Sequence, residues 1–164
     1  MNLTETILVL AVSIIVVAGV AVVFSNARDK HNQTKTMQSL LFMRANIEQV
    51  FANADFTGLD SALLRSGNLV PADLEDPHDE NAIRSIWGPI EVAGDGKEYT
   101  ITLSELSTSA CQGIAILSTT SWSKVEVGGQ ELYNREDNQP INNIALVQGC
   151  SGKGDTNSIT FTAP

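Results

Sequence analysis

The sequence lacks the motifs that most enzymes use for catalysis. Its only histidines are His31 and His78, and its two cysteines do not form a CxxC motif. No glycine-rich phosphate loop follows a predicted strand, and no GxSxG motif frames a serine as a nucleophile. The sequence therefore predicts a structural or binding protein with no cofactor, and not an enzyme.

Basic side chains are also scarce. The 164-residue chain has 10 Lys and Arg against 19 Asp and Glu, which gives a formal net charge of −9. Residues 1–54 have four basic and three acidic side chains, for a net charge of +1, whereas residues 55–164 have six and sixteen, for −10. Because an acidic surface repels phosphates, we expect no direct binding to nucleic acid.

The first 27 residues contain no Lys or Arg, and Glu5 is their only charged residue. From Ile7 to Phe24 the sequence ILVLAVSIIVVAGVAVVF has 18 residues without a charge. As a helix this segment would be about 27 Å long, close to the thickness of a bilayer's hydrocarbon core. It is apolar on every side, which predicts a membrane-spanning helix. A cleaved signal peptide fits poorly, since the sequence has neither a basic start nor a convincing cleavage site.

The charges around this apolar segment suggest the wrong topology. Arg28, Lys30 and Lys35 all follow it, so the positive-inside rule would keep the rest of the chain in the cytoplasm. The acidic surface and turn-rich β pattern of the rest instead indicate an exported body. A basic leader that preceded Met1 and was removed would resolve the contradiction, so we expect Met1 to be a processed N-terminus.

The absence of proline from residues 1–54 gives the helix no reason to end after the apolar segment. Apolar residues then recur at the spacing of an amphipathic helix. This stripe consists of Met37, Leu40, Leu41, Ile47, Val50, Phe51 and Ala54. We predict one helix from about residue 2 to about residue 54, with a hydrophobic half, residues 1–24, and an amphipathic half, residues 25–54.

Residues 55–97 carry weak periodicity, and we predict an irregular segment with one short helix, SALLRS, closed by Gly67. Five acidic residues surround His78 in this segment. They are Asp73, Glu75, Asp76, Asp79 and Glu80. Clustered carboxylates attract divalent cations, but the spacing matches no binding loop, and we expect a solvated acidic loop without a metal.

The C-terminal half has clearer patterns. The alternation in residues 98–103 and 158–162 predicts two strands. Ser104 and Ser107 are candidate caps before an apolar run, which predicts a short helix over about 107–119. A strand over GIAIL is the alternative. Gly128-Gly129 between two alternating segments predicts a hairpin, and Pro140 is expected to begin a further helix.

The only two cysteines are Cys111 and Cys150. In an exported domain a disulfide between them is expected. In a reducing cytosol we would instead expect both cysteines to be reduced and buried as small hydrophobic residues. The choice between these interpretations depends on the topology of the chain.

The opening MNLTETILVLAVSIIVVAGVAVVF resembles the mature N-terminus of type IV pilins. The shared features are a hydrophobic first residue, Glu5, an apolar run to about residue 24 and an amphipathic continuation. Met1 in place of Phe, and the lack of proline in residues 1–54, make the chain more similar to the type IVb subclass. Cys111 and Cys150 match the disulfide that bounds the family's D-region.

The resemblance implies the α+β pilin fold, in which a long N-terminal helix packs on a mainly antiparallel β-sheet head with small extra helices. The head would comprise residues 55–164. Within it, residues 55–97 would be the loop between helix and sheet, and residues 111–150 the D-region. A Cys111–Cys150 bridge of this kind would stabilise the head by about 3–4 kcal/mol.

The resemblance also implies a major pilin that polymerises with copies of itself into an extracellular pilus, or fimbrium. A prepilin peptidase would remove the leader and N-methylate Met1. The subunit would wait in the bacterial inner membrane until the pilus assembly machinery extrudes it, and a minor pilin or adhesin would occupy the tip. Such pili serve cell-surface attachment, aggregation or conjugative contact.

In the family, Glu5 pairs with the N-terminal amine of a neighbouring subunit, which here is that of Met1. A carboxylate is costly to leave unpaired in an apolar medium, and breaking a buried ion pair costs about 3–5 kcal/mol. A simpler interpretation is that Glu5 only interacts with its own helix start, worth about 0.3–1 kcal/mol.

Two other functions are compatible with the sequence. A minor pilin or a type II secretion pseudopilin would have the same N-terminal chemistry with fewer copies. A monomeric, membrane-anchored extracellular binding module would use the apolar segment only as an anchor.

Overall fold

The computed structural model describes the backbone of residues 3–138, 140–152 and 154–164, and within these ranges the side chains from residue 25 onward. The chain divides into two compact units, Met1–Asn32 and Gln33–Pro164. The second unit, which we call the head, contains the last turns of the N-terminal helix and all of the sheet.

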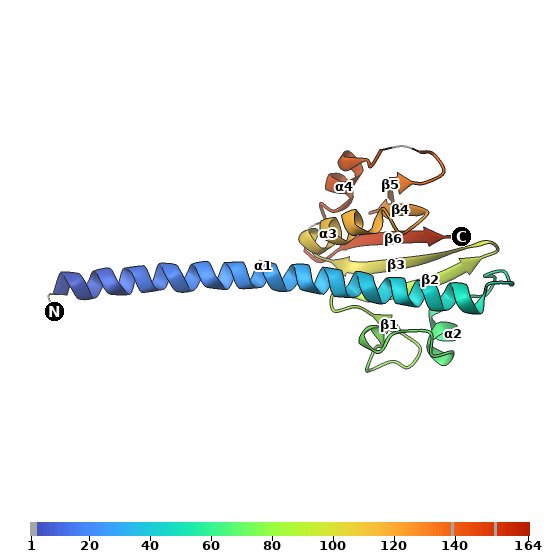
Figure 1. Ribbon diagram of the computed structural model, residues 1–164, viewed down its shortest axis with the longest axis horizontal. Helices are drawn as coiled ribbons and strands as arrows, with labels where there is room; N and C mark the ends of the chain where they lie inside the picture. Colours follow the sequence, from blue (N-terminus) through green and yellow to red (C-terminus); the bar gives the residue numbers. More distant parts are fainter. Residues whose placement is uncertain (1–2, 139, 153) are drawn as a thin grey trace. The chain divides into compact units, whose positions relative to one another are not determined.

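A single helix, α1, runs from Leu3 to Val50 (Figure 1). This confirms the prediction of one long helix, but the helix ends before residue 54. A turn replaces its last part, because Ala54 N donates to Phe51 O (3.0 Å) and the Asp55 carboxylate accepts a bond from Thr57 N (3.1 Å).

Within the residues whose side chains are described, no helix is long and apolar enough to cross a bilayer. The apolar segment of residues 7–24 has its side chains outside that part of the chain. Its role in a membrane therefore stays a prediction.

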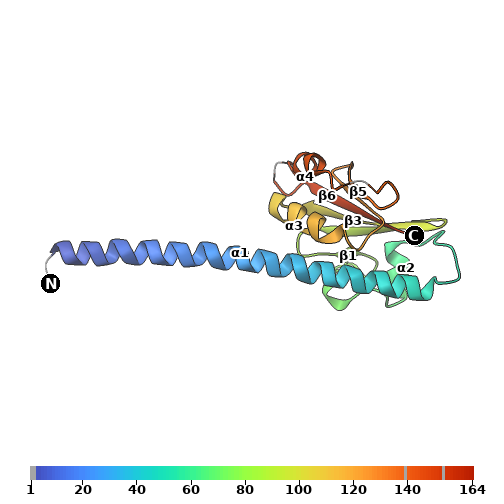
Figure 2. The ribbon, with the colours of Figure 1, turned by 45° about the horizontal axis from the view of Figure 1, so that its top comes forward.

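The head contains a six-stranded antiparallel sheet with the order β1-β2-β3-β6-β4-β5. The strands are β1 (Ile83–Arg84), β2 (Pro89–Asp95), β3 (Glu98–Leu106), β4 (Lys124–Val127), β5 (Gln130–Asn134) and β6 (Asn157–Ala163). The last strand of the chain thus lies in the middle of the sheet. In Figures 1 and 2, β1 and α2 lie at one end of the sheet and β5 and α4 at the other.

Four short helical segments complete the head: α2 (Ser61–Ser66), the 3₁₀ helix η1 (Ala72–Leu74), α3 (Thr108–Ser118) and α4 (Asn143–Gly149). Each α-helix among them begins with a side-chain cap, which satisfies a backbone N–H that has no partner within the helix. The caps are Asp60, Ser107 and Asn142, which accept bonds from Leu63, Ala110 and Ala145.

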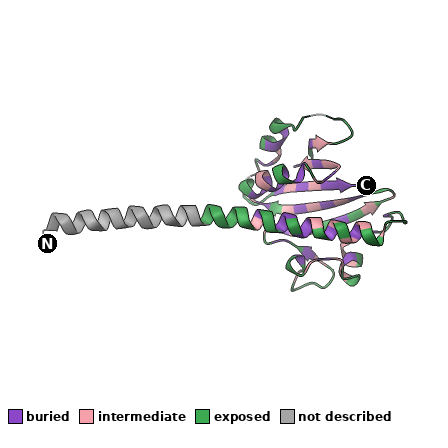
Figure 3. Cartoon of the chain, viewed as in Figure 1, coloured by how far each residue is buried: buried purple, intermediate pink, exposed green. Residues whose placement is uncertain are grey.

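The core lies between the sheet and the inner face of α1. Leu40, Met43 and Ile47 of α1 are fully buried, as are Tyr99 and Phe161 of the sheet. Figure 3 shows buried and exposed residues alternating along the part of α1 that belongs to the head. The amphipathic stripe therefore predicts the packing face of α1 well, with two exceptions: Val50 is exposed, and so is Ala54, which lies beyond the end of the helix.

Most predicted elements are confirmed, including the helix after Ser107, the strands around residues 98–103 and 158–162, and the hairpin. Gly128 and Gly129 have φ angles of +56° and +77°. A two-residue turn that fits the twist of a hairpin needs such angles, which glycine adopts without strain.

Two predictions are wrong. Residues 55–97 are not irregular, since they contain β1 and β2 as well as α2 and η1. The segment PIEVAGD does alternate, with Ile90 and Val92 buried, but glycines and prolines around it hide the pattern. The final helix begins at Asn143 and not at Pro140, because Asn142 supplies the cap.

Candidate assembly surfaces

The two residues predicted to drive assembly fall outside what the structure describes in full. Met1 lies outside the described residues, and of Glu5 only the backbone is described, as part of α1. Their pairing between neighbouring subunits therefore stays a prediction.

The predicted disulfide is present. Cys111 lies in α3 and Cys150 follows α4, with a distance of 5.7 Å between their Cα atoms. Both residues are fully buried. The bond closes the segment that contains α3, β4, β5 and α4 into one covalent loop.

Polar side chains on the inner face of α1 fasten the helix to three different parts of the head. Gln33 Nε2 donates to Ser109 O in α3 (3.2 Å). Ser39 Oγ donates to the Asp73 carboxylate of η1 (2.6 Å), and Asn46 Nδ2 donates to Leu69 O (3.1 Å). An apolar stripe permits some sliding of a helix, but these directional bonds define one position along its axis. The spacing of apolar residues in the sequence carries no signal for these bonds.

Arg44 forms the centre of a cluster between α1 and the sheet. Its guanidinium donates to Ser121 O, pairs with Glu48 one turn along α1, and lies 5.1 Å from the centre of the Trp122 ring. Such a cation–π contact is worth about 0.5–2 kcal/mol, more when it is shielded from water. Arg44 thus joins the helix to the loop between α3 and β4.

Tyr99 lies in the same cluster and is fully buried. Burial and, secondly, the charge of Glu48 raise the pKa of its hydroxyl above the ordinary value, while Arg44 acts in the opposite direction. Arg44 is therefore close enough to Tyr99 to lower the pKa of its hydroxyl. Among the described residues, however, no group makes a hydrogen bond to Tyr99 Oη or to Trp122 Nε1. The cluster therefore keeps two buried polar atoms without a protein partner, which is uncommon.

The acidic loop uses several of its carboxylates to shape its own backbone. Asp76 and Asp79 accept bonds from the backbone N–H of His78 and Asn81, each 2.8 Å long. Glu75 forms an ion pair with Arg65 of α2 (2.9 Å). In the described part of the chain, no three or more His, Cys, Asp and Glu side chains are grouped as metal ligands.

Helices α3 and α4 expose an apolar surface. Neither TSACQGIAILS nor NIALVQG contains a charged residue, although the head is strongly acidic. Ile116 and Leu117 of α3 and Ile144 and Val147 of α4 are exposed. We call these four residues the aliphatic face. A lack of charge together with exposed large aliphatic residues is typical of a surface that contacts another protein.

The turn between β1 and β2, at the β1 edge of the sheet, carries another exposed aliphatic side chain. Ile86 is 63% exposed, between β1 and β2. The buried hydroxyl of Ser85 holds this turn by donating to Gly88 O (3.1 Å) and accepting from the N–H groups of Trp87 and Gly88 (3.2 Å each). The turn therefore presents Ile86 in one fixed position.

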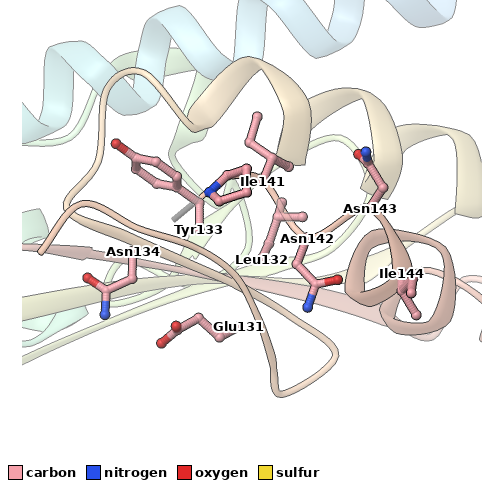
Figure 4. Close-up of a pocket in the computed structure, with 9 residues that line it drawn as sticks. Glu131, Leu132, Tyr133, Asn134, Ile141, Asn142, Asn143 and Ile144 are labelled. Atoms are coloured by element: carbon pink, nitrogen blue, oxygen red, sulfur yellow. The ribbon is translucent and has the colours of Figure 1, made fainter. Parts of the chain in front are cut away.

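A hollow of about 470 Å³ opens between β5 and the segment that leads into α4 (Figure 4). Its lining consists of Glu131, Leu132, Tyr133, Asn134, Pro140, Ile141, Asn142, Asn143 and Ile144. The sequence analysis gave no signal for it, because the two lining segments are brought together only by the fold.

Comparisons with known proteins agree with this architecture. The profile of a family described as PilS N terminal matches residues 30–164. The chain is 22% identical over 177 residues to the major structural subunit of bundle-forming pilus from Escherichia coli O127:H6 (strain E2348/69 / EPEC), covering 98% of this chain and 92% of the relative. It is 21% identical, with the same coverage, to the protein of that name from Escherichia coli O111:H-.

Two solved structures share the fold. TcpA, a type IV pilin from Vibrio cholerae El Tor biotype, aligns with a TM-score of 0.59 and 15% identity, over 82% of this chain and 99% of TcpA. The type IV b pilin from Salmonella typhi aligns with a TM-score of 0.59 and 20% identity, over 76% and 95% of the two chains. With the family match over most of its length, the chain belongs to the PilS N terminal family and has the α+β fold of the type IVb pilins.

Proposed function

We propose that this protein is the major structural subunit of a type IV pilus, a polymer built from copies of this chain. The observation that carries the proposal is the pilin fold of the head, which follows an N-terminal segment with a single acid in an apolar run. The curated relatives named above as major structural subunits support the same function. Their names also favour a structural and not a catalytic role.

Assembly would begin in the bacterial inner membrane. A prepilin peptidase would cut the leader and N-methylate Met1, and the apolar segment would hold the subunit in the bilayer. The assembly machinery would then transfer this segment into the core of the filament. Glu5 would neutralise the amine of Met1 in a neighbouring subunit, since an unpaired carboxylate in an apolar core is strongly unfavourable.

The heads would form the outer surface of the filament. The aliphatic face on α3 and α4 and the Ile86 turn at the β1 edge of the sheet belong to different parts of the head, and both are exposed. A contact between two different surfaces of identical subunits produces a helical polymer when its rotation does not close into a ring. These two surfaces suit such a contact between successive heads.

The extracellular pilus would serve cell-surface attachment, aggregation or conjugative contact, with a minor pilin or adhesin at its tip. No residue in the sequence favours one of these three roles over the other two. The acidic surface of the head would repel the phosphates of nucleic acid, so we propose no direct binding to nucleic acid.

The central experiment is Glu5→Ala in cells that express the protein. We expect the variant to remain in the inner membrane and the yield of sheared filaments to fall at least about 100-fold, as loss of a buried charge partner implies. Asp29→Ala is the matched control, because Asp29 is an exposed acid of the same helix. Filaments formed at the normal rate without Glu5 would contradict the proposed mechanism.

Two further measurements separate the alternatives. A minor pilin or pseudopilin would be a minor component of sheared filaments, whereas the major subunit would dominate their mass. A monomeric binding module would function normally with Glu5→Ala. The mass of the N-terminal peptide tests processing, since we expect a methylated Met1 without a leader.

A further inference from the structure

The hollow beside β5 has the size of a binding site for a small molecule. Sites of this kind usually have volumes of about 300–1,000 Å³, and this one measures about 470 Å³. It lies beside the outermost strand of the sheet, inside the segment that the disulfide closes. The site is therefore at the surface and within a covalently restrained part of the head.

Local hydrogen bonds hold both walls of the hollow in place. Asn142 N donates to Leu132 O (2.9 Å), which fixes the segment before α4 to β5. The Asn142 side chain accepts a bond from Ala145 N (3.1 Å). At the other end, the Asn134 amide accepts from Glu136 N (3.1 Å) and donates to the Asp137 carboxylate (2.9 Å). Two lining amides are thus held in one orientation, and a preformed site loses less entropy on binding.

The charges around the hollow exclude strongly charged ligands. Among the described residues, Glu131 is the only charged side chain in the lining, and Lys124 Nζ lies 3.4 Å from its carboxylate. No basic side chain among the described lining residues could hold an anion, and the head carries a large negative charge. A single carboxylate that already has a cationic partner is also a poor site for a metal ion.

The remaining lining combines amides with apolar surfaces. The amides are those of Asn134, Asn142 and Asn143, and the apolar surfaces come from Tyr133, Pro140, Ile141 and Ile144. In Figure 4, the side chains of Glu131, Asn134 and Asn142 lie on one side of the hollow, and those of Tyr133 and Ile141 on the other.

An amide both donates and accepts hydrogen bonds, as a hydroxyl group does. A sugar ring presents hydroxyl groups at its edge and C–H groups on its faces, which match an amide rim and an apolar wall. We propose that the hollow between β5 and α4 binds a neutral saccharide. Such a site would give the unassembled head a ligand-binding role that requires no second subunit. Because Ile144 also belongs to the aliphatic face, a head-to-head contact there would compete with the ligand.

The test uses the purified full-length chain in dodecylphosphocholine, a detergent without a sugar group. NMR spectra would be recorded during titration with the methyl glycosides of glucose, galactose, mannose and N-acetylglucosamine. We expect at least one glycoside to shift the Ile144 methyl and Asn143 amide signals saturably, with a dissociation constant of about 1–10 mM. No saturable shift with any of the four up to about 100 mM would overturn the proposal.

Three variants locate the binding. Ile144→Asn should weaken binding by about 10-fold and Asn143→Ala by about 5-fold, whereas Val147→Asn should change it less than about 2-fold. Val147 is a matched control, because it is exposed on the same helix but does not line the hollow. An equal loss in Val147→Asn would contradict the assignment, as would unchanged binding in Asn143→Ala.

Charge is tested with glucose 6-phosphate, which should bind no more tightly than the neutral glucoside. Tighter binding of the phosphate would overturn the neutral class of ligand. All titrations use unassembled chain, so filament formation does not affect them. A Glu5→Ala variant that fails to polymerise should bind the glycoside normally, which separates this proposal from the proposed function.

Discussion

The two segments beside the central strands β3 and β6 are held in place by different means. Residues 55–97, beside β3, contain no cysteine; besides their buried apolar side chains and the β2–β3 ladder, polar contacts of Ser39 with Asp73 and of Asn46 with Leu69 O hold them to α1. Residues 107–150, beside β6, are closed by the Cys111–Cys150 disulfide.

Both segments bury apolar side chains in the core, so the difference lies in the contacts that supplement this packing. The segment beside β3 carries the acidic loop and supplements its packing with hydrogen bonds and ion pairs. The segment beside β6 has two charge-free helices with exposed aliphatic residues, and a covalent bond keeps it closed. The first should respond to salt and to loss of single polar groups, and the second to reduction.

The largest expected effect is loss of the disulfide. The double variant Cys111→Ser/Cys150→Ser should lose about 4 kcal/mol of unfolding free energy, because the bond closes a loop of about 40 residues. Urea denaturation of wild type with and without reductant measures the same quantity. The variant should not respond to reductant, and a loss below about 1 kcal/mol would mean that non-covalent contacts already hold this segment.

Arg44→Met should destabilise the head by about 2–3 kcal/mol, because it removes the bond to Ser121 O and the contact with Trp122 and leaves Glu48 without its partner. Arg44→Lys keeps the charge but not the planar guanidinium, and it should recover less than half of the loss. A Lys variant as stable as wild type would show that charge alone matters here.

The stability of the head should fall as the pH rises above 10. The pKa of Tyr99 is raised from its ordinary value of 10.0 by burial. Above that pH the unfolded chain releases the Tyr99 proton while the folded chain keeps it, which favours unfolding by up to about 1.4 kcal/mol per pH unit.

Denaturation midpoints at pH 9, 10 and 11 would measure this slope, with Tyr99→Phe as the control. The variant should lose the Tyr99 contribution and keep its stability at pH 7, since the removed hydroxyl has no hydrogen-bond partner among the described residues. Equal slopes in wild type and Tyr99→Phe would assign the pH dependence to other groups, such as Lys124, whose pKa its bond to Glu126 raises.

Ser39→Ala should cost about 1–2 kcal/mol, since the Ser39 hydroxyl donates to the Asp73 carboxylate. Gln38→Ala, at an exposed neighbouring position of α1, is the control and should change stability by less than about 0.5 kcal/mol. A double-mutant cycle with Asp73→Ala would show no coupling if the bond does not form in solution.

The smallest effect concerns the Arg65–Glu75 ion pair. Glu75→Gln should cost about 0.2–1 kcal/mol at low salt, because the glutamate side chain is 40% exposed. About 1 M NaCl should abolish the difference from wild type by screening. A salt-independent loss of the same size would assign the effect to hydrogen bonding in place of charge.

Local patterns in the sequence were sufficient for much of the fold. Ser107 and the apolar run after it predicted α3, and Gly128-Gly129 predicted the hairpin, because caps and tight turns depend on only a few adjacent residues. The start of the last helix was wrong because Pro140 and Asn142 are both suitable there, and only packing selects Asn142.

The candidate surfaces could be predicted from the sequence much less well than the fold. The charge-free helices can be recognised in the sequence, but the exposure of Ile116, Leu117, Ile144 and Val147 cannot. The hollow joins residues 131–134 to residues 140–144, and the Arg44 cluster joins α1 to residues more than fifty positions later. Both depend on contacts between distant segments, which have no local signal.

The sequence by itself determined the helix with its apolar beginning and amphipathic continuation, the Ser107 cap, the hairpin and the acidic character of the head. These features follow from side-chain spacing and from the conformational preferences of single residues. Only the tertiary structure decided that β6 lies between β3 and β4, that Gln33, Ser39, Arg44 and Asn46 turn inward, and that a hollow forms beside β5. The physical reason is that pairing of distant strands and burial of polar groups depend on partners that the chain meets only when it has folded.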